Sequence, residues 1–419
     1  MATHFTFTFV ALLLLMLGLK YWLAQRQMRH VAAHADAVPP RFADRVSLAA
    51  HRKAAAYTIA RQRLGLVEIA VGAAVLIALT LLGGINLIGD GLAALVGRGF
   101  AFQVLIVAAV VALTSAIDLP FSWYRQFTLE QSFGFNRMTP RLFLIDLAKS
   151  VVLAVALGLP LLAVVLWLMR QAGAVWWLYA WFVWAGFSLL IMVLYPTVIA
   201  PLFNKFEPLR DSALAERVRA LLGRTGFSSK GVFVMDGSRR SSHGNAYFTG
   251  LGRAKRVVFF DTLVQRLSAA EIEAVLAHEL GHFRLKHVTK RLIVTFASSL
   301  ALLALLGWLA NQAWFYQGLG VTPALGARND GLALVLFMLV LPVFTFVLAP
   351  LASLLSRKHE FEADAFAAKH ASASDLVTAL VKLYEDNAAT LTPDPVHSAF
   401  YDSHPPAAIR IERLLARAA

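Results

Sequence analysis

Long apolar runs, separated by shorter polar segments, are the dominant pattern along this chain. A helix needs about 20 consecutive, mostly apolar residues to cross the hydrocarbon core of a membrane. Seven runs meet this requirement: residues 5–23, 65–86, 101–119, 149–169, 175–196, 292–311 and 331–352. The third run ends at Asp118-Leu119-Pro120. The pattern therefore predicts an integral-membrane protein with seven transmembrane helices.

Positive charge alternates between the segments that connect these runs. Residues 24–64 carry eight Arg or Lys, whereas the next connection carries only Arg98. The connection 120–149, the long segment 197–291 and the C-terminal tail are basic again. Because Lys and Arg accumulate in cytoplasmic loops, we expect these segments in the cytoplasm and the N-terminus outside. The first run has basic residues only after it, which favours a retained anchor over a signal peptide.

The composition agrees with a protein that has lipid as part of its solvent. Apolar residues make up 58% of the chain and charged residues only 15%, against about 25% charged in a soluble domain. The net charge of +14 would also suit a nucleic-acid partner, but basic membrane loops explain it and no nucleic-acid-binding motif is present. The chain has no cysteine, so any transition metal must have His and carboxylate ligands.

The spans divide the chain into four parts. Residues 1–196 hold transmembrane helices one to five, and residues 197–291 form a cytoplasmic catalytic insert. Residues 292–352 hold helices six and seven, and residues 353–419 form a cytoplasmic tail. Neither the insert nor the tail is long enough to bury a large core alone. We expect them to pack on each other and on the helix ends.

The insert contains the candidate chemistry, in the segment LSAAEIEAVLAHELGHFRLKH. Ser268 and Glu271 have the spacing of a capping box, which predicts the start of a helix. Four apolar residues would form its buried face: Ile272, Val275, Leu276 and Leu280. His278 and His282 are four apart and therefore leave the same helix face, where two imidazoles can hold one Zn²⁺. Glu279 is placed to act as general base on a water that the zinc activates.

A catalytic zinc needs a third protein ligand and one open position. The metzincin pattern would require a histidine at position 288, which is Val288. The tail offers SRKHEFEADAFAAKH instead, in which Glu360 and Asp364 share a helix face. We expect Glu360 to bind the zinc and Asp364 to hold the outer N–H of a ligand histidine. His359 and Glu362 are rival ligands on other faces, and an amphipathic surface helix is the alternative.

At these residues the sequence resembles the type 1 CAAX prenyl proteases, integral-membrane zinc enzymes that trim prenylated proteins. HELGH at 278–282 is similar to the family's zinc helix, and EFEAD at 360–364 to its third-ligand element. Four longer segments are also similar: residues 119–139, 195–209, 237–263 and 403–410. The resemblance covers most of the chain from the third span onward.

The resemblance implies an all-α membrane fold. Seven helices would surround a water-filled chamber, and a mainly helical protease domain with a small β element would cap its cytoplasmic end. It also implies that Asn245 lies on the strand that pairs with the substrate backbone, and that His404 and Arg410 close the site and stabilise the oxyanion. The implied substrate is a prenylated protein ending in Cys-a-a-X. One zinc ion per chain is the implied cofactor.

Other functions remain open from the sequence. The composition, rich in Ala and Arg and without cysteine, is typical of a prokaryotic protein and favours a bacterial inner membrane. If the source is eukaryotic, we expect the endoplasmic reticulum. In a bacterium the enzyme could remove faulty membrane proteins without any prenyl requirement. A site-2 protease is disfavoured because basic residues follow HELGH directly and keep it out of a span. A zinc-carrying transporter is disfavoured because Glu68 and Asp118 lie only near span ends. The oligomeric state stays open, a monomer included.

Overall fold

A computed structural model of the chain describes residues 1–227, 231–249, 256–324 and 328–418. Within them, seven helical segments are long and apolar enough to cross a membrane, which confirms the predicted number. They are Ala2–Ala33, Leu48–Leu79, Phe100–Glu130, Pro140–Gln171, Gly173–Phe203, His287–Leu309 and Asp330–His370. Each predicted run overlaps one of these segments.

Several of the spans consist of more than one helical element. The elements are α1 (Ala2–Ala33), α2 (Leu48–Leu79), α4 (Phe100–Tyr124) with η2 (Arg125–Glu130), α5 (Pro140–Leu153) with η3 (Ala154–Gly158) and α6 (Leu159–Gln171), η4 (Gly173–Val175) with α7 (Trp176–Leu194), η5 (Tyr195–Ile199) and α8 (Ala200–Phe203), α12 (His287–Leu309), and α14 (Asp330–Thr345) with η8 (Phe346–Leu348) and α15 (Ala349–His370).

One predicted boundary is wrong, and one helix continues beyond the apolar run that predicted it. The second run was expected to reach residue 86, but α2 ends at Leu79 and the chain turns at Gly83 (φ 79°) into a separate helix, α3 (Gly84–Val96). The third run ends near Pro120, and this proline lies inside α4, which continues beyond the run. Hydropathy averages over such positions and therefore does not detect the glycine turn. Proline is tolerated in transmembrane helices where neighbouring groups satisfy the freed backbone.

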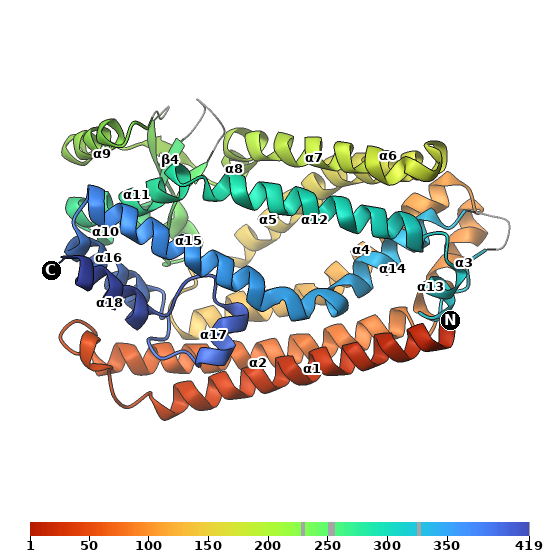
Figure 1. The fold of residues 1–419 in the computed structure, drawn as a ribbon, viewed down its shortest axis with the longest axis horizontal. Coiled ribbons are helices and arrows are strands. Elements are labelled where there is room, and N and C mark those ends of the chain that lie inside the picture. Colours follow the sequence, from red (N-terminus) through yellow and green to blue (C-terminus); the bar gives the residue numbers. More distant parts are fainter. Residues whose placement is uncertain (228–230, 250–255, 325–327, 419) are drawn as a thin grey trace.

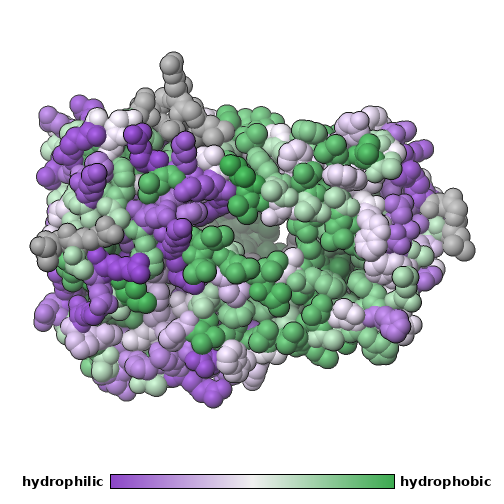
Figure 2. Space-filling model, viewed as in Figure 1, coloured by the Kyte–Doolittle hydropathy of each residue, from purple (hydrophilic) through white to green (hydrophobic). Residues whose placement is uncertain are grey.

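The membrane helices form thin walls around a hollow interior. Helices α1, α2, α7 and α12 run along the long axis of the molecule (Figure 1). In five of the seven spans only 6–11% of the most apolar window is buried, so most of these side chains face lipid or the interior. The space-filling view shows an apolar band between two polar ends, with a hollow within the band (Figure 2). This arrangement is that of a helical chamber and confirms the expected fold class.

The two ends of the chamber differ. At the end that carries the N-terminus, α3 and the short helix α13 (Ala313–Gln317) pack against the spans (Figure 1). At the other end lie α9 (Ser212–Arg224) and a four-stranded sheet. Its strands are β1 (Phe206–Pro208), β2 (Val232–Met235), β3 (Ala246–Thr249) and β4 (Arg256–Phe260), in the order β1-β2-β4-β3. Strands β2 and β4 are parallel and the other two pairs are antiparallel. Strand β3 is last in the strand order and is therefore an edge strand.

The remaining helices join the insert to the tail. They are α10 (Asp261–Arg266), α11 (Ala269–Arg284), α16 (Ala373–Asp386), α17 (Pro395–Tyr401) and α18 (Ala407–Ala418), with the short turns η1 (Pro40–Phe42) and η6 (Gly237–Arg239). One buried apolar cluster contains Val218, Phe259 and Leu276 of the insert together with Leu380 and Ile411 of the tail. Two distant parts of the chain therefore share a core, and this core fixes α11 relative to α15.

Candidate metal centre

Helix α11 carries both histidines of the HELGH segment. It begins as predicted, because the Ser268 side chain accepts from the backbone N–H of Glu271 and the Glu271 carboxylate accepts from the N–H of Ser268. The four predicted apolar residues are buried: Ile272, Val275, Leu276 and Leu280. With that face in the core, His278 and His282 lie together on the side that faces α15.

Helix α15 can approach these histidines closely enough to place Glu360 beside them because Gly281 of α11 has no side chain. A Cβ atom at Gly281 would lie 3.0 Å from the Cα atom of Ala363 and 3.1 Å from the Cβ atom of Phe366. The two helices therefore touch backbone to backbone at this position. Helix α15 continues span seven without a loop, so one helical segment leads from the predicted span into the tail that carries Glu360.

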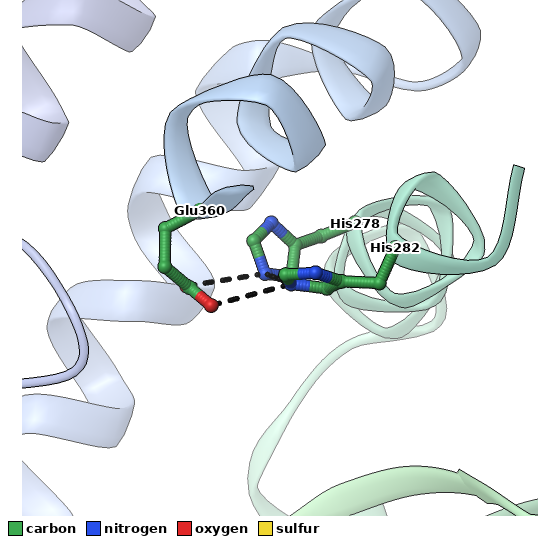
Figure 3. A group of neighbouring side chains, drawn as sticks. All are labelled: His278, His282 and Glu360. Carbon is green, nitrogen blue, oxygen red and sulfur yellow. Dashed lines mark hydrogen bonds and ion pairs between the residues drawn. The ribbon is translucent and has the colours of Figure 1, made fainter. Parts of the chain in front are cut away.

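Ligand atoms of three side chains lie close together, and we call these three residues, His278, His282 and Glu360, the triangle (Figure 3). The two Nε2 atoms of His278 and His282 are 3.2 Å apart. Glu360 Oε2 lies 3.5 Å from His278 Nε2, and Glu360 Oε1 lies 3.3 Å from His282 Nε2. A tetrahedral zinc with bonds of about 2.0–2.1 Å holds its ligand atoms about 3.3 Å from one another. The separations therefore fit one zinc ion.

One buried oxygen atom at the same point supports this fit. Glu360 is 5% exposed, yet its Oε2 atom has no hydrogen-bond partner among the described residues. The cationic Nη1 atom of Arg410 lies 3.5 Å away without a hydrogen bond to it, so a bound metal ion would compensate this buried oxygen more fully. His278 directs its Nδ1 atom at Asp364 Oδ1, 2.8 Å away. That bond puts the ring proton of a neutral His278 on Nδ1 and leaves a lone pair on Nε2, toward the triangle.

Asp364 and Arg410 form a buried ion pair behind the histidine. The Nε and Nη2 atoms of Arg410 donate to the two Asp364 oxygens at 2.7 and 2.8 Å. Arg410 Nη1 lies 3.5 Å from Glu360 Oε2. Burial disfavours the charge on Arg410, but Asp364 outweighs it and the pKa of Arg410 is raised. Burial and Arg410 also oppose charge on His278, but Asp364 and Glu360 raise the pKa of His278.

Glu279 and His404 border the cavity beside the triangle. Glu279 follows the first histidine on α11 and lines the cavity. Burial raises the pKa of its carboxyl group, which makes the carboxylate a stronger base. His404 lies between α17 and α18, with its Nδ1 atom 3.6 Å from Glu360 Oε2 and its side chain 60% exposed. Both side chains can therefore meet a peptide that enters the cavity.

Asn245 directly precedes the edge strand β3. Its side-chain oxygen accepts from the N–H of Ala246 at 2.8 Å, and its backbone carbonyl accepts from the N–H of Phe260 at 3.0 Å. Asn245, Ala246 and Tyr247 line the same cavity as the histidines. Residues 250–255 of the family-like segment 237–263 lie outside the described residues.

The cavity joins the triangle to the membrane helices. Its volume is about 1490 Å³, and its lining includes Lys20 of α1, Gly65 and Ile69 of α2, and Arg125 of η2. Pockets for small ligands usually measure about 300–1,000 Å³. This space is therefore large enough for an extended peptide with a bulky attachment.

Two further residues support the site: His287, whose sequence position did not indicate it, and Glu362, which the sequence offered only as a rival zinc ligand. His287, the first residue of α12, places its Nδ1 atom 3.0 Å from His282 Nδ1. Glu362 accepts from His287 Nε2 at 2.8 Å. Helical spacing separates His287 from the face of His282. It reaches that histidine only because the chain breaks at Lys286, which has a left-handed backbone (φ 58°). The rivals His359 and Glu362 lie beside His287 and form a separate group from the triangle.

Comparisons with known proteins place this geometry in a family. The model for the "CAAX prenyl protease N-terminal, five membrane helices" matches residues 27–205, and that for "Peptidase family M48" matches residues 208–418. The CAAX prenyl protease 1 homolog of Arabidopsis thaliana is 40% identical over 316 residues, which are 74% of this chain and 72% of the relative. The chain belongs to peptidase family M48.

Other members support the assignment over nearly the full length. CAAX prenyl protease 1 of Saccharomyces cerevisiae is 37% identical over 315 residues, which are 72% of this chain and 70% of the relative. The crystal structure of S. mikatae Ste24p has a TM-score of 0.91 at 30% identity and covers 98% of this chain and 99% of its own. This M48 member is therefore a multi-pass membrane zinc metalloprotease, as predicted. The matches do not favour a transporter or a prenyl-independent protease.

Proposed function

We propose that this M48 protease cleaves prenylated proteins near a C-terminal CAAX sequence. The triangle of His278, His282 and Glu360, open to a cavity that reaches the membrane helices, is the observation that carries the proposal. A peptide bond can lie at the triangle while an apolar chain on the same peptide extends between the spans. The names of the A. thaliana and S. cerevisiae relatives point to the same substrate class.

The proposal gives each residue of the site a role. His278, His282 and Glu360 would hold a zinc ion, which would supply a Lewis acid and lower the pKa of a bound water. Glu279 takes the proton of the attacking water and passes it to the leaving amine. His404 donates to the carbonyl oxygen as negative charge develops there.

The remaining residues of the site hold it in shape or bind substrate. Asp364 fixes the ring of His278, and Arg410 holds Asp364 and Glu360 in place. The edge strand β3 supplies the substrate-binding surface. This strand lies at the end of the sheet, and an extended peptide can add to such an edge as a further strand. Asn245 at the start of β3 would then bond the substrate backbone beside the scissile bond. This geometry would hold the peptide extended between β3 and α11, with Glu279 and His404 on either side.

The same proposal covers location. We place the N-terminus outside, and the insert 197–291, the tail 353–419 and the zinc site in the cytoplasm, as the basic loops indicate. Membrane helices one to five occupy residues 1–196 and helices six and seven residues 292–352. A bacterial inner membrane fits the composition, and one chain contains all the residues of the site, so a monomer suffices for activity.

Cleavage of a farnesylated CAAX peptide, beside its unmodified twin, tests the proposal on purified protein. We expect faster cleavage of the farnesylated peptide, loss of activity with a zinc chelator and recovery when zinc is returned. Glu279→Gln is the control, because it should keep the zinc and lose turnover. Equal rates on both peptides would contradict the substrate class and leave the protease assignment standing. Wild-type rates in Glu279→Gln would contradict the role of this residue.

A further inference from the structure

The two histidines of the triangle have different partners on their outer nitrogens. His278 Nδ1 faces a carboxylate, Asp364, directly. His282 Nδ1 faces another imidazole, the Nδ1 atom of His287, at 3.0 Å. A bond between two such nitrogens requires that one carries the hydrogen and the other a lone pair. If Nδ1 of His282 carries the hydrogen, Nε2 of a neutral His282 has a lone pair and can bind a metal. If Nδ1 of His287 carries it, the hydrogen of His282 is on Nε2 and His282 cannot bind a metal there.

The contact with Glu362 fixes which nitrogen of His287 carries the hydrogen. Its Oε2 atom lies 2.8 Å from His287 Nε2, and a carboxylate can only accept. The hydrogen of His287 is therefore on Nε2, and its Nδ1 atom carries the lone pair. His282 must then donate from Nδ1, which leaves the lone pair of His282 on Nε2. Nε2 is the atom that faces Glu360 at 3.3 Å.

The surroundings of His287 suit a fixed acceptor. Its side chain is only 2% exposed, whereas that of Glu362 is 34% exposed. The ring of His359 stacks on the His287 ring, with centroids 4.1 Å apart and planes 12° from parallel. Helix α12 holds His287 and helix α15 holds Glu362 and His359. The bonds therefore tie spans six and seven to the metal-binding helix α11.

A second metal site formed by His287, His359 and Glu362 is the competing explanation, because their ligand atoms lie within 4.8 Å of one another. Both nitrogens of His287 are already engaged, with His282 and with Glu362. Nitrogen lone pairs lie in the plane of their ring, so two nearly parallel stacked rings do not direct them at one ion. The geometry therefore favours a hydrogen-bond relay over a second metal.

We propose that His287 is a positioning residue which, backed by Glu362, fixes the tautomer and orientation of His282 for zinc binding. The inference rests on the proposed zinc site and adds a residue to it. Partners of this kind on a ligand histidine typically change metal affinity by about 10–100-fold when they are lost. The relay should act on the metal first and on turnover through the metal.

Zinc affinity of three purified variants, measured by competition with a chelator, tests the relay. His287→Phe keeps a ring against His359 but removes the acceptor, and should weaken zinc binding by about 10–100-fold. His287→Gln restores an acceptor and should bind zinc nearly as the wild type does. His359→Phe is the matched control, because it keeps the stacked pair without touching the relay.

Glu362 gives a second pair of variants on an accessible side chain. Glu362→Gln can still accept from His287 through its amide oxygen and should retain zinc. Glu362→Lys can only donate, which would move the His287 hydrogen to Nδ1 and the His282 hydrogen to the metal-facing Nε2. Zinc affinity should then fall. This pair also decides the question if His287→Phe does not fold.

Cobalt substitution supplies a readout that a general loss of stability would not change. The visible spectrum of Co²⁺ reports the ligands around the ion, so a displaced His282 should alter it in His287→Phe and not in His287→Gln. Wild-type zinc affinity with an unchanged cobalt spectrum in both His287→Phe and Glu362→Lys would overturn the relay. Full zinc content in a His278→Ala variant would instead overturn the proposed zinc site.

Discussion

Asp364 shows how much a single buried side chain contributes to the site. It accepts two bonds from Arg410 and one from His278 while it is 4% exposed. A buried carboxylate tolerates this position only because these donors compensate its charge. The positions of His278 and Arg410 therefore depend on one carboxylate.

Removal of the guanidinium should destabilise the fold as well as the site. Arg410→Ala leaves the Asp364 charge buried and uncompensated, and loss of one partner of such a pair costs about 3–5 kcal/mol. A lower midpoint of thermal unfolding in detergent, together with lower zinc content, is the expected result. Arg413→Ala is the control on the same helix, because Arg413 is exposed and lies over the Phe361 ring. Equal midpoints for the two variants would contradict the prediction.

The third ligand has its own direct test. Glu360→Ala removes the carboxylate from the triangle and leaves two imidazoles, so zinc content by elemental analysis should fall well below one ion per chain. Glu412 lies on α18 and forms an exposed ion pair with Arg41. Glu412→Gln should therefore leave the zinc content unchanged. A full complement of zinc in Glu360→Ala would show that another group completes the site.

Sequence reasoning reached some of these residues and missed others for a physical reason. His278, His282, Glu360 and Asp364 lie within regular helices, so their spacing predicts which of them share a face. His287 enters the site through a left-handed residue that ends the helical register, and no periodic pattern extends across such a break. The distance between Glu360 and the histidines is likewise a matter of tertiary packing, and here the family resemblance supplied what spacing did not.

At the scale of the elements, Gly281 sets the distance between α11 and α15. The close approach of α11 and α15 occurs at this glycine, where a Cβ atom would meet backbone atoms of Ala363. Backbone atoms cannot rotate away as the end of a flexible side chain can. A methyl group here must push the two helices apart, and Glu360 is one turn away from the contact.

Gly281→Ala should therefore weaken zinc binding without touching a ligand. The extra carbon separates α15 from α11 and lengthens the distance from Glu360 to both histidines. Chelator competition on the purified variant should show faster loss of zinc than in the wild type. Gly223→Ala, where a Cβ atom meets nothing within 4 Å on α9, is the control. Identical zinc loss in all three proteins would contradict the inferred close packing.

A second set of contacts between elements holds the start of β3. His243 lies two residues before Asn245, and its Nδ1 atom is 3.0 Å from Asn387 Oδ1 at the end of α16. Its Nε2 atom is 3.4 Å from Glu130 Oε2 in η2, and Glu130 also accepts from Tyr57 of α2. Spans two and three are thereby linked to the edge strand that we propose binds substrate.

Loss of this link should affect substrate binding more than metal binding. His243→Ala frees the segment before β3 while the triangle on α11 and α15 stays intact. The expected result is a higher KM for the peptide at unchanged zinc content, since ordering the strand would then cost part of the binding energy. An unchanged KM would show that β3 is held by its pairing with β4 alone.

At the scale of the whole molecule, hydropathy predicted the number of spans, and the structure explains why it did not predict where the helices begin and end. Polar residues continue several helices beyond the apolar runs, so α2 begins at Leu48 and α15 extends to His370. Transfer free energy determines where a helix lies in lipid, but hydrogen bonding and packing determine where it stops. The chamber itself follows from contacts between spans, which no single run contains.

The proposed orientation can be tested because the chain has no cysteine, so an introduced thiol is the only one present. Asp90→Cys on α3 and Arg210→Cys beside β1 replace side chains that are 71% and 85% exposed at opposite ends of the molecule. The basic loops place position 90 outside and position 210 in the cytoplasm. An impermeant maleimide should therefore label Asp90→Cys in spheroplasts, and Arg210→Cys only after the membrane is opened. The reverse pattern would put the zinc site outside, where a cytoplasmic prenylated protein could not reach it, and would contradict both orientation and substrate.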